Sequence, residues 1–390
     1  MERNDAAGER RDPPAILDRA FERAHTQLHQ PQLSDPLNLQ KISYICRSIS
    51  NRACARFLLA CCLAKAYNPS WDIRKPYTEI RSPDSYPGRT YDERYITPFI
   101  IQHNLPCNMT TAFLTPAFRN RNVPLTPGLV MVGRPERLYQ ATLEVLSDIQ
   151  ADKLTAEDVL AEVTRQLLLL REEQLLRTEG ISNQLRTSEG VTLSAETIVT
   201  LIEQHLKCPN SSRLPVLVVA AAYKAAEEHL KEHVLPLTPH NAADRRTGAL
   251  GDLQICLLGD SRITTVYEMK TRRVTPSDLE IALQKVASLG HRIDKYIFIT
   301  TEEITPQVHQ YAISLYKRTG GIEFAILDCI SFIRHFLHLF HHLRNNFLDI
   351  YQQLLLEEPE SSVRQELKEA FLALRLAAVS SNGIGGDEGN

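Results

Sequence analysis

Two mostly apolar stretches joined by a short polar turn constrain the fold of this chain more than any other feature. The stretches cover residues 253–258 and 263–267, and three polar residues, 260–262, lie between them. Short, partly alternating stretches with β-branched residues, separated by a tight turn, predict two antiparallel strands. The start of the first strand is then expected beside the end of the second.

Three charged residues lie at those adjoining strand ends. Asp252 begins the first strand, and Glu268 and Lys270 end the second. Glu268 and Lys270 are two residues apart and therefore face one side of the sheet, whereas Met269 faces the other. The hairpin is thus expected to bring two carboxylates and one amine together. A pattern this short is by itself more often a surface ion pair, so its context has to decide.

The segments after residue 214 alternate between helix and strand. Helices are expected at 214–233, 276–289, 307–318, 330–356 and 363–377, and further strands at 295–300 and 322–327. This order predicts an α/β (α+β) fold, with a mixed β-sheet flanked by helices. The last two strands are joined by helical crossovers and are expected to be parallel to each other.

The N-terminal half predicts a helix-rich region interrupted by irregular chain. Helices are expected at 15–30, 39–67, 153–177 and 193–206. Residues 68–135 contain ten prolines, and their aromatic residues are interleaved with arginines. That proline density excludes a regular helix bundle, and long irregular segments of a compact protein are commonly functional. Residues 44–137 carry 13 Lys and Arg against 6 Asp and Glu, which favours a polyanionic partner.

Composition places the chain among ordinary globular proteins. It has 390 residues, of which 43% are hydrophobic and 23% charged, enough for two or three domains. No apolar run reaches the ~18 residues that span a bilayer, and the polar N-terminus does not resemble a secretory signal. A cytoplasmic protein without membrane contact is therefore expected. The eight cysteines form no Cys-x-x-Cys motif and are expected to be buried free thiols.

The charged cluster at the strand ends suits divalent-metal chemistry. Asp252 and Glu268 offer the hard oxygen ligands that Mg²⁺ prefers, with Mn²⁺ as an alternative ion. The main-chain carbonyl of Met269 is expected to supply a third oxygen. Lys270 is expected to orient or deprotonate an attacking water and to offset charge that develops in the transition state.

The neighbouring helices offer further candidates for the same site. Glu228, or failing that Glu227, precedes the two strands, and Gln284 follows them. Three histidines between 335 and 342 share one helix face and invite a metal interpretation. Apolar residues form the adjoining face, however, so a polar helix surface is favoured over a histidine metal site, and an HNH-type nuclease is disfavoured.

These residues carry a family resemblance. A helix with an acid, Asp252 at a strand start, Glu268-x-Lys270 and then a helix and a strand resemble the PD-(D/E)xK nuclease core over residues 214–330. One departure is Gly251, where that motif has proline. The runs 75–81, 86–96, 105–108 and 110–120 are similar to the SacI family of type II restriction endonucleases, and with them the resemblance covers nearly the whole chain.

The resemblance implies a cytoplasmic restriction endonuclease. It implies Mg²⁺-dependent cleavage of double-stranded DNA at a palindromic site, of which GAGCTC or a related sequence is the family's example. It also implies a homodimer, and a cognate DNA methyltransferase that acts in the same restriction-modification system without forming a stable complex. The expected organisation is a flexible terminus at 1–14, a DNA-recognition region at 15–210, a nuclease core with C-terminal helices at 211–379, and a disordered tail at 380–390.

The arginines are the expected DNA contacts under this interpretation, because their planar donors suit both phosphates and base edges. In the recognition region and around the two strands the candidates are Arg81, Arg89, Arg94, Arg119, Arg121, Arg245, Arg246, Arg272 and Arg273. Two alternatives remain open: a non-catalytic DNA-binding protein on a nuclease fold, and a PD-(D/E)xK nuclease that acts in DNA repair or on RNA.

Overall fold

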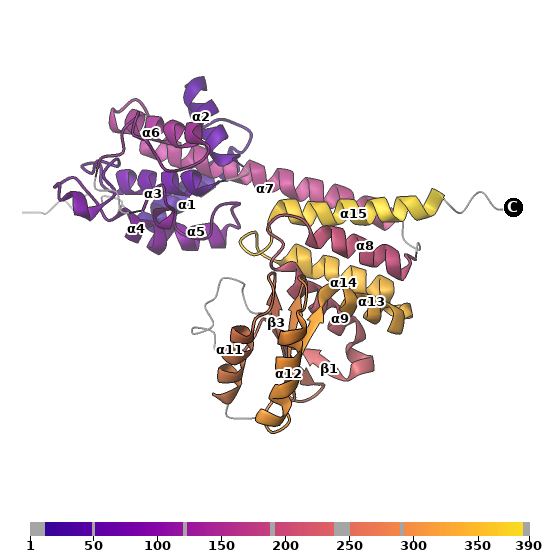
Figure 1. The fold of residues 1–390 in the computed structure, drawn as a ribbon. Helices are drawn as coiled ribbons and strands as arrows, with labels where there is room; N and C mark the ends of the chain where they lie inside the picture. Colours follow the sequence, from indigo (N-terminus) through magenta and orange to yellow (C-terminus); the bar gives the residue numbers. More distant parts are fainter. Residues whose placement is uncertain are drawn as a thin grey trace, which may run out of the picture. The chain divides into compact units, whose positions relative to one another are not determined.

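The chain forms two compact units, one up to residue 176 and the other from residue 177. The computed structural model describes residues 12–48, 51–119, 123–187, 192–237, 250–288 and 292–384. The long helix α7 (Ala156–Thr187) belongs to both units (Figure 1). The observed division therefore falls earlier than the boundary expected at 210–211. Its cause is α8 (Ala195–Leu206), whose apolar side chains share a core with the C-terminal helices.

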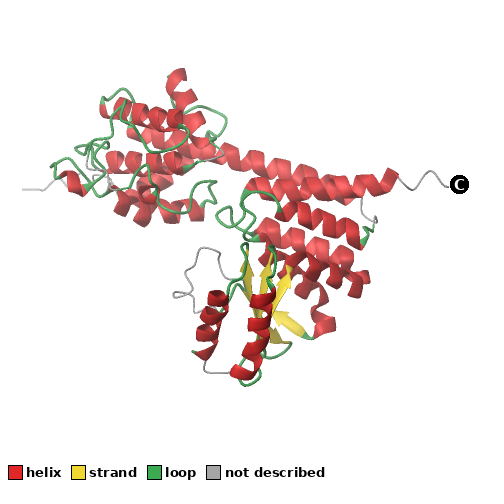
Figure 2. Ribbon diagram, viewed as in Figure 1, coloured by secondary structure: helices red, strands yellow, loops and turns green. Residues whose placement is uncertain are grey.

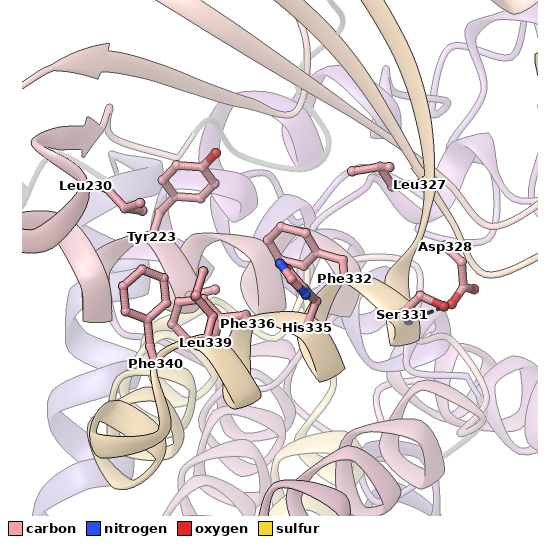
Figure 3. Close-up of a pocket in the computed structure, with 11 residues that line it drawn as sticks. Tyr223, Leu230, Leu327, Asp328, Ser331, Phe332, His335, Phe336, Leu339 and Phe340 are labelled. Atoms are coloured by element: carbon pink, nitrogen blue, oxygen red, sulfur yellow. Dashed lines mark hydrogen bonds between the residues drawn. The ribbon is translucent and has the colours of Figure 1, made fainter.

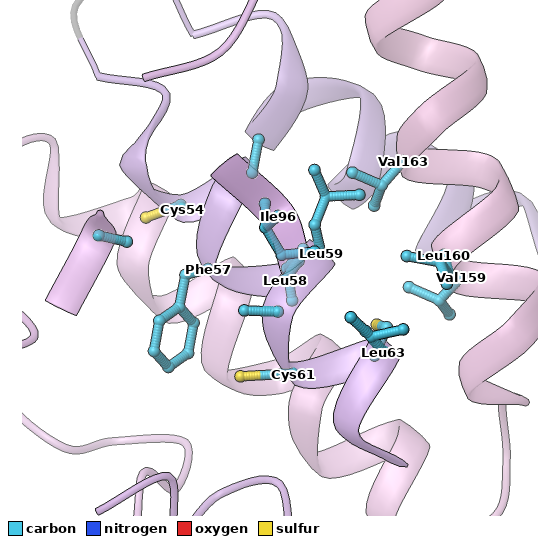
Figure 4. Close-up of a cluster of buried hydrophobic side chains, with 14 of the residues drawn as sticks. Cys54, Phe57, Leu58, Leu59, Cys61, Leu63, Ile96, Val159, Leu160 and Val163 are labelled. Carbon is cyan, nitrogen blue, oxygen red and sulfur yellow. The ribbon is translucent and has the colours of Figure 1, made fainter. Parts of the chain in front are cut away.

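Helices dominate the first unit, and α3 runs through its core. α3 (Ala53–Tyr67) is buried on almost every side and packs against α7, as Figure 4 shows for Leu63 and Val159. The other elements are α1 (Pro13–Thr26), α2 (Pro36–Cys46), α4 (Gly88–Tyr91), α5 (Thr97–Gln102), α6 (Glu136–Gln150) and short turns at Thr78–Ile80, Asp92–Ile96 and Ala112–Leu114.

The single helix predicted at 39–67 is wrong, because the structure has two helices there. α2 ends at Cys46 and α3 begins at Ala53. Asn51 Oδ1 accepts the Ala53 N–H at 2.9 Å, and such a local bond competes with continuation of a helix from the preceding residues. A fully buried helix such as α3 has no polar face to show its period, so the hydrophobic pattern did not mark where this helix begins.

Several aromatic residues of the proline-rich segment lie in the core of the first unit, whereas some of its arginines are exposed. Tyr86, Tyr91 and Phe118 are buried, whereas Arg89 and Arg94 are exposed. These three rings are therefore core residues of this unit.

A buried ion pair ties this segment to α3. The Arg56 guanidinium donates from Nε to Asp92 Oδ1 at 2.7 Å and from Nη1 to the carbonyl oxygens of Asn108 and Met109 at 2.6 and 2.7 Å. Asp92 Oδ2 accepts the Thr111 hydroxyl at 2.8 Å. Arg56 and Asp92 are both fully buried, so this network satisfies both charges and connects the helical run 88–102 and the loop at 108–111 to α3.

A five-stranded mixed sheet forms the centre of the second unit (Figure 2). Its strands, in spatial as well as chain order, are β1 (Glu232–Val234), β2 (Leu253–Leu257), β3 (Ile263–Lys270), β4 (Lys295–Thr300) and β5 (Glu323–Asp328). The predicted antiparallel hairpin is confirmed, because Leu253 pairs with Tyr267. The predicted parallel pairing of β4 and β5 is confirmed as well, and β3 is also parallel to β4.

Strand β1 was not expected from the sequence. The helix predicted to reach residue 233 ends earlier, as α9 (Leu214–Leu230), at Lys231, whose φ of 55° lies in the left-handed region. β1 then pairs with the far end of β2, where Glu232 lies opposite Leu257. Three residues are too few to show a strand period, which explains why the pattern gave no signal.

Helices cover both faces of the sheet (Figure 1). α11 (Pro276–Ala287) and α12 (Pro306–Arg318) pack on the face that carries Val266, Tyr296 and Phe298. The other face, with Leu253, Ile255 and Tyr267, packs in the apolar cluster of the remaining helices. These are α8, α9, α13 (Cys329–Leu339), α14 (Arg344–Glu357) and α15 (Gln365–Ile384).

The helix predicted at 330–356 is also divided. α13 ends at Leu339, a short 3-10 turn follows at His341–Leu343, and α14 begins at Arg344. The expected burial of the cysteines is confirmed for seven of the eight free thiols, and Cys208 is partly exposed. No helix within the described ranges has the length and apolar character needed to cross a bilayer.

Candidate active site

Asp252 lies immediately before β2, opposite Glu268 on β3. Its N–H donates to the Tyr267 carbonyl at 2.9 Å, and its Oδ2 accepts the Met269 N–H at 2.7 Å. The carboxylate is thus fixed to the backbone of the neighbouring strand. A Cβ at Gly251 would lie 2.6 Å from the Tyr267 carbonyl oxygen. The departure from proline at this position therefore has a steric cause, because only glycine allows β3 to approach so closely.

Glu268 is held by three side chains from three elements. Its Oε1 accepts a hydrogen bond from Lys270 Nζ at 2.9 Å, on the same strand. Its Oε2 lies 3.2 Å from Lys285 Nζ, on α11, and 2.7 Å from the hydroxyl of Tyr296, on β4. Tyr296 is fully buried, so the tyrosine contact comes from inside the core.

The predicted orientation of the hairpin side chains is confirmed. Glu268 and Lys270 alternate with Tyr267 and lie on the face covered by α11, where Glu268 meets Lys285. Met269 packs instead with the apolar cluster on the opposite face. The Met269 N–H is engaged by Asp252, and a metal-ligating role for its carbonyl oxygen stays a prediction.

The two carboxylates differ in their electrostatic surroundings. Burial raises the pKa of the Asp252 carboxyl, and the charge of Glu268 raises it further against the opposing effects of the Met269 N–H and Lys270. Burial would also raise the pKa of Glu268, but the hydrogen bond and charge of Lys270, followed by Lys285 and Tyr296, hold it below its ordinary value. Glu268 is therefore the more stably ionised of the pair.

A third carboxylate, Asp278, connects the site to the start of α11. Its Oδ2 accepts the N–H of Thr275, and it forms a capping box with that residue. Asp278 Oδ1 lies 2.6 Å from Arg272 Nη2 and 3.8 Å from Lys270 Nζ. Although burial opposes it, the hydrogen bonds from Arg272 and Thr275 lower the pKa of Asp278 strongly. The cap thus fixes both the helix and the cations beside it.

The structure does not bring Glu228 to this cluster. α9 packs on the face opposite α11, and Glu228 is exposed and paired with Lys231 at 3.1 Å, near the far end of β2. Glu227 is paired with His233 at 3.0 Å. Gln284 lies on the correct helix but is exposed, and its neighbour Lys285 is the residue that reaches Glu268. Tertiary packing decides which face of the sheet a preceding helix covers. Adjacency in the sequence does not determine it.

Asp252 and Glu268 are the residues that would hold a divalent ion at this site. The part of the chain described by the structure contains no group of three or more His, Cys, Asp or Glu side chains suited to a metal. Mg²⁺, however, is commonly held by one or two carboxylates, with waters and substrate phosphates as its remaining ligands. Asp252 and Glu268 lie at one sheet end, and the charge of Glu268 raises the pKa of Asp252, so two carboxylates of this ligand class lie close together.

Most of the predicted DNA-contacting arginines that the structure describes have protein partners or aromatic contacts. Arg272 pairs with Asp278, and Arg273 pairs with Glu303 at 2.8 Å. In the first unit Arg89 pairs with Glu93, Arg94 lies 5.3 Å from the ring centroid of Tyr95, and Arg81 and Arg119 are exposed. Arg121, Arg245 and Arg246 lie outside the described residues. The DNA contacts stay predictions.

Lys285 and Tyr296 are site residues that sequence reasoning missed. Lys285 follows Asp278 by seven residues, which is two helical turns, so both lie on one face of α11. Tyr296 lies within a mostly apolar strand and looks like an ordinary core residue. For Lys285 the sequence did contain a signal. Asp278 and Lys285 place charged residues on one face of the helix, and the preceding strand also ends in charged residues.

An apolar groove lies on the opposite face of the sheet, away from these residues (Figure 3). It has a volume of about 370 Å³ and lies between the end of β5, α9 and α13. Phe332, Phe336 and Leu339 line it, together with Tyr223 and Leu327. The Tyr223 hydroxyl is bonded to that of Tyr267 at 2.8 Å. The groove therefore approaches β3 from behind, and its polar lining residues are Asp328, Ser331 and His335.

The charged cluster, and not the groove, is the candidate active site. Among the residues the structure describes, it alone combines acids and ammonium groups at one sheet end, and a buried tyrosine reaches it from β4. Comparison with protein-family models and with the curated proteins gives no match to this chain.

Proposed function

We propose that this chain is a type II restriction endonuclease of the SacI family, which hydrolyses phosphodiester bonds of double-stranded DNA at a palindromic site, with Mg²⁺ as cofactor and as a homodimer. The observation that carries the proposal is the meeting of Asp252, Glu268 and Lys270 on one face of one sheet end. The similarity of the N-terminal runs to that family is the reason for proposing that cleavage is specific to a DNA sequence.

The order of elements supports the nuclease interpretation. α9 precedes an antiparallel meander of β1, β2 and β3, and α11 then leads to β4, which is parallel to β3. This arrangement is similar to a PD-(D/E)xK core, with the acid before β2 and the Glu-x-Lys at the end of β3. Ligands of sheets with such crossovers commonly bind beyond the carboxyl ends of the parallel strands, which is where Glu268 and Lys270 lie.

Each residue then has a chemical task. Asp252 and Glu268 would hold Mg²⁺, which when bound polarises the phosphodiester and increases the acidity of a water. Lys270 Nζ, fixed by Glu268 at 2.9 Å, would orient the attacking water and oppose the negative charge that develops on the phosphate oxygens. The buried Tyr296 hydroxyl orients Glu268 and leaves its ionised form favoured.

Digestion of plasmid DNA tests the proposal. The native protein with Mg²⁺ is expected to give discrete fragments, and EDTA is expected to abolish them. Asp252→Asn and Lys270→Met should each lower the cleavage rate by about 100-fold or more. Lys295→Met is the matched control, because this exposed lysine begins β4 at the other end of the sheet.

The result also separates the alternatives. Sequence-specific binding without cleavage would support a non-catalytic DNA-binding protein on the same fold. Cleavage without discrete fragments would support a nuclease of repair or RNA processing. Undiminished cleavage by both variants would refute the assigned site.

A further inference from the structure

We propose that His229 and His342 form a second metal site, which binds one divalent transition ion of the Zn²⁺ class and joins the end of α9 to the turn between α13 and α14. The site is separate from the charged cluster. His229 lies in the last turn of α9, which leads into β1, and β1 pairs with the far end of β2. The inference does not depend on the proposed nuclease function.

The structure gives His342 a different neighbour from the one that the sequence indicates. His342 follows the end of α13, in the 3-10 turn His341–Leu343, and therefore does not share a helix face with His335 and His338. Its ring meets the ring of His229 instead, with the ring centroids 5.2 Å apart. Tertiary packing thus pairs two histidines that are 113 residues apart in the sequence.

The distance between the two rings fits a shared metal ion better than a hydrogen bond. His229 Nε2 lies 3.4 Å from His342 Nε2, whereas an N–H donor and its acceptor are usually ~2.7–3.2 Å apart. Two imidazole nitrogens bound to one tetrahedral Zn²⁺, each ~2.0–2.1 Å from the ion, are ~3.3–3.4 Å from each other. The two nitrogens therefore already have the spacing of two ligands of one ion.

Both nitrogens are accessible to an ion from solvent. The two side chains are exposed, and within the described ranges neither ring has a polar contact besides the other ring. Their remaining contacts are aromatic: Phe340 lies 5.9 Å from His229, and His341 lies 5.4 Å from His342, between ring centroids. A neutral imidazole that carries its proton on Nδ1 presents the lone pair of Nε2 to a metal.

The type of donor selects the class of ion. Imidazole nitrogen suits Zn²⁺, Ni²⁺ and Cu²⁺, whereas Mg²⁺ prefers oxygen ligands. The described residues contain no group of three or more His, Cys, Asp or Glu suited to a metal, so water would fill the remaining positions of this two-histidine site. Because the unfolded chain lacks the paired geometry, an ion that ties α9 to the turn after α13 stabilises the native state.

Calorimetric titration with Zn²⁺ tests the site on the full-length chain. The native protein is compared with His229→Asn, His342→Asn and the double variant, all of which change exposed side chains. Each single substitution is expected to weaken one Zn²⁺ site by about tenfold or more. The double variant is expected to bind as the single variants do, because one ion uses both ligands. His335→Asn, which removes an exposed histidine outside the pair, is the matched control and is expected to bind Zn²⁺ as the native chain does.

Unfolding in denaturant supplies the second measurement. Zn²⁺ at about 100 times its Kd is expected to raise the folding equilibrium constant of the native second unit by up to about 100-fold, and to raise that of the single variants far less. A Zn²⁺ affinity that neither substitution changes would overturn the proposal. Losses of affinity that add in the double variant would overturn it as well, because they are the behaviour of two independent surface histidines.

Discussion

His205 makes the stability of the second unit depend on pH in a predictable way. The ring is fully buried, with Nε2 3.0 Å from the Leu367 carbonyl oxygen and Nδ1 3.0 Å from the Tyr351 hydroxyl. Because a carbonyl only accepts, Nε2 carries the proton and Tyr351 donates to Nδ1. Burial lowers the pKa of His205 from 6.5 to about 4, and the bond to Leu367 only partly opposes this shift.

The sign and size of the effect come from the linkage between proton binding and folding. Between pH 6.5 and 4 the unfolded chain binds a proton at His205 that the native state does not, so the stability present above pH 6.5 is lost as the pH falls. A shift of about 2.5 units at ~1.4 kcal/mol per unit gives ~3 kcal/mol in total, of which about 2 kcal/mol is lost between pH 7 and pH 5.

Denaturant unfolding of the native chain and of His205→Gln measures this effect. Glutamine does not titrate, and its amide can replace both hydrogen bonds. The difference between the unfolding free energies of the two proteins therefore removes the contribution of every other titratable group. Far-UV circular dichroism follows the unfolding of both units. The fluorescence of the single tryptophan, Trp71, follows the first unit alone and is therefore the internal control. A difference in unfolding free energy that stays constant from pH 7 to pH 5 would refute the reasoning.

Two further predictions concern single side chains. Arg56→Met leaves the Asp92 carboxylate buried without its cation and should destabilise the first unit by about 3–5 kcal/mol, measured by the fluorescence of Trp71 in denaturant. Gly251→Ala places a Cβ 2.6 Å from the Tyr267 carbonyl oxygen and should displace Asp252, so that DNA cleavage falls by about tenfold or more while the melting temperature changes by only a few degrees. Native cleavage by this variant would show that the strand contact does not position the acid.

The hairpin could be predicted from sequence because its information is local. The period of two along β2 and β3 and the turn between them predict the antiparallel pairing. Asp252 lies opposite Glu268 only because the register shifts by one residue between Ile255 and Cys256, which the turn does not predict. Helix boundaries at 46–53 and 339–344 could not be predicted in the same way. The first break is a mostly polar run, but α3, which follows it, is buried on several sides and has no polar face to mark its start.

The site itself shows where local information stops. Glu228 was a reasonable candidate by adjacency, but the three residues of β1 return the chain from α9 to β2 and leave that helix on the face opposite Glu268. A lysine such as Lys285, on an amphipathic helix, is in most proteins part of a solvated surface. Only the packing of α11 on β3 and β4 turns it into a partner of Glu268.

One short segment builds the whole cluster, and this has a mechanical consequence. The hairpin supplies Asp252, Glu268 and Lys270, and α11 supplies Asp278 and Lys285. The acids of the hairpin are thus fixed by strand pairing, whereas the outer cation is fixed by a helix whose start depends on its capping box. A disturbance of that cap would move the helix and its lysine and leave the paired acids in place.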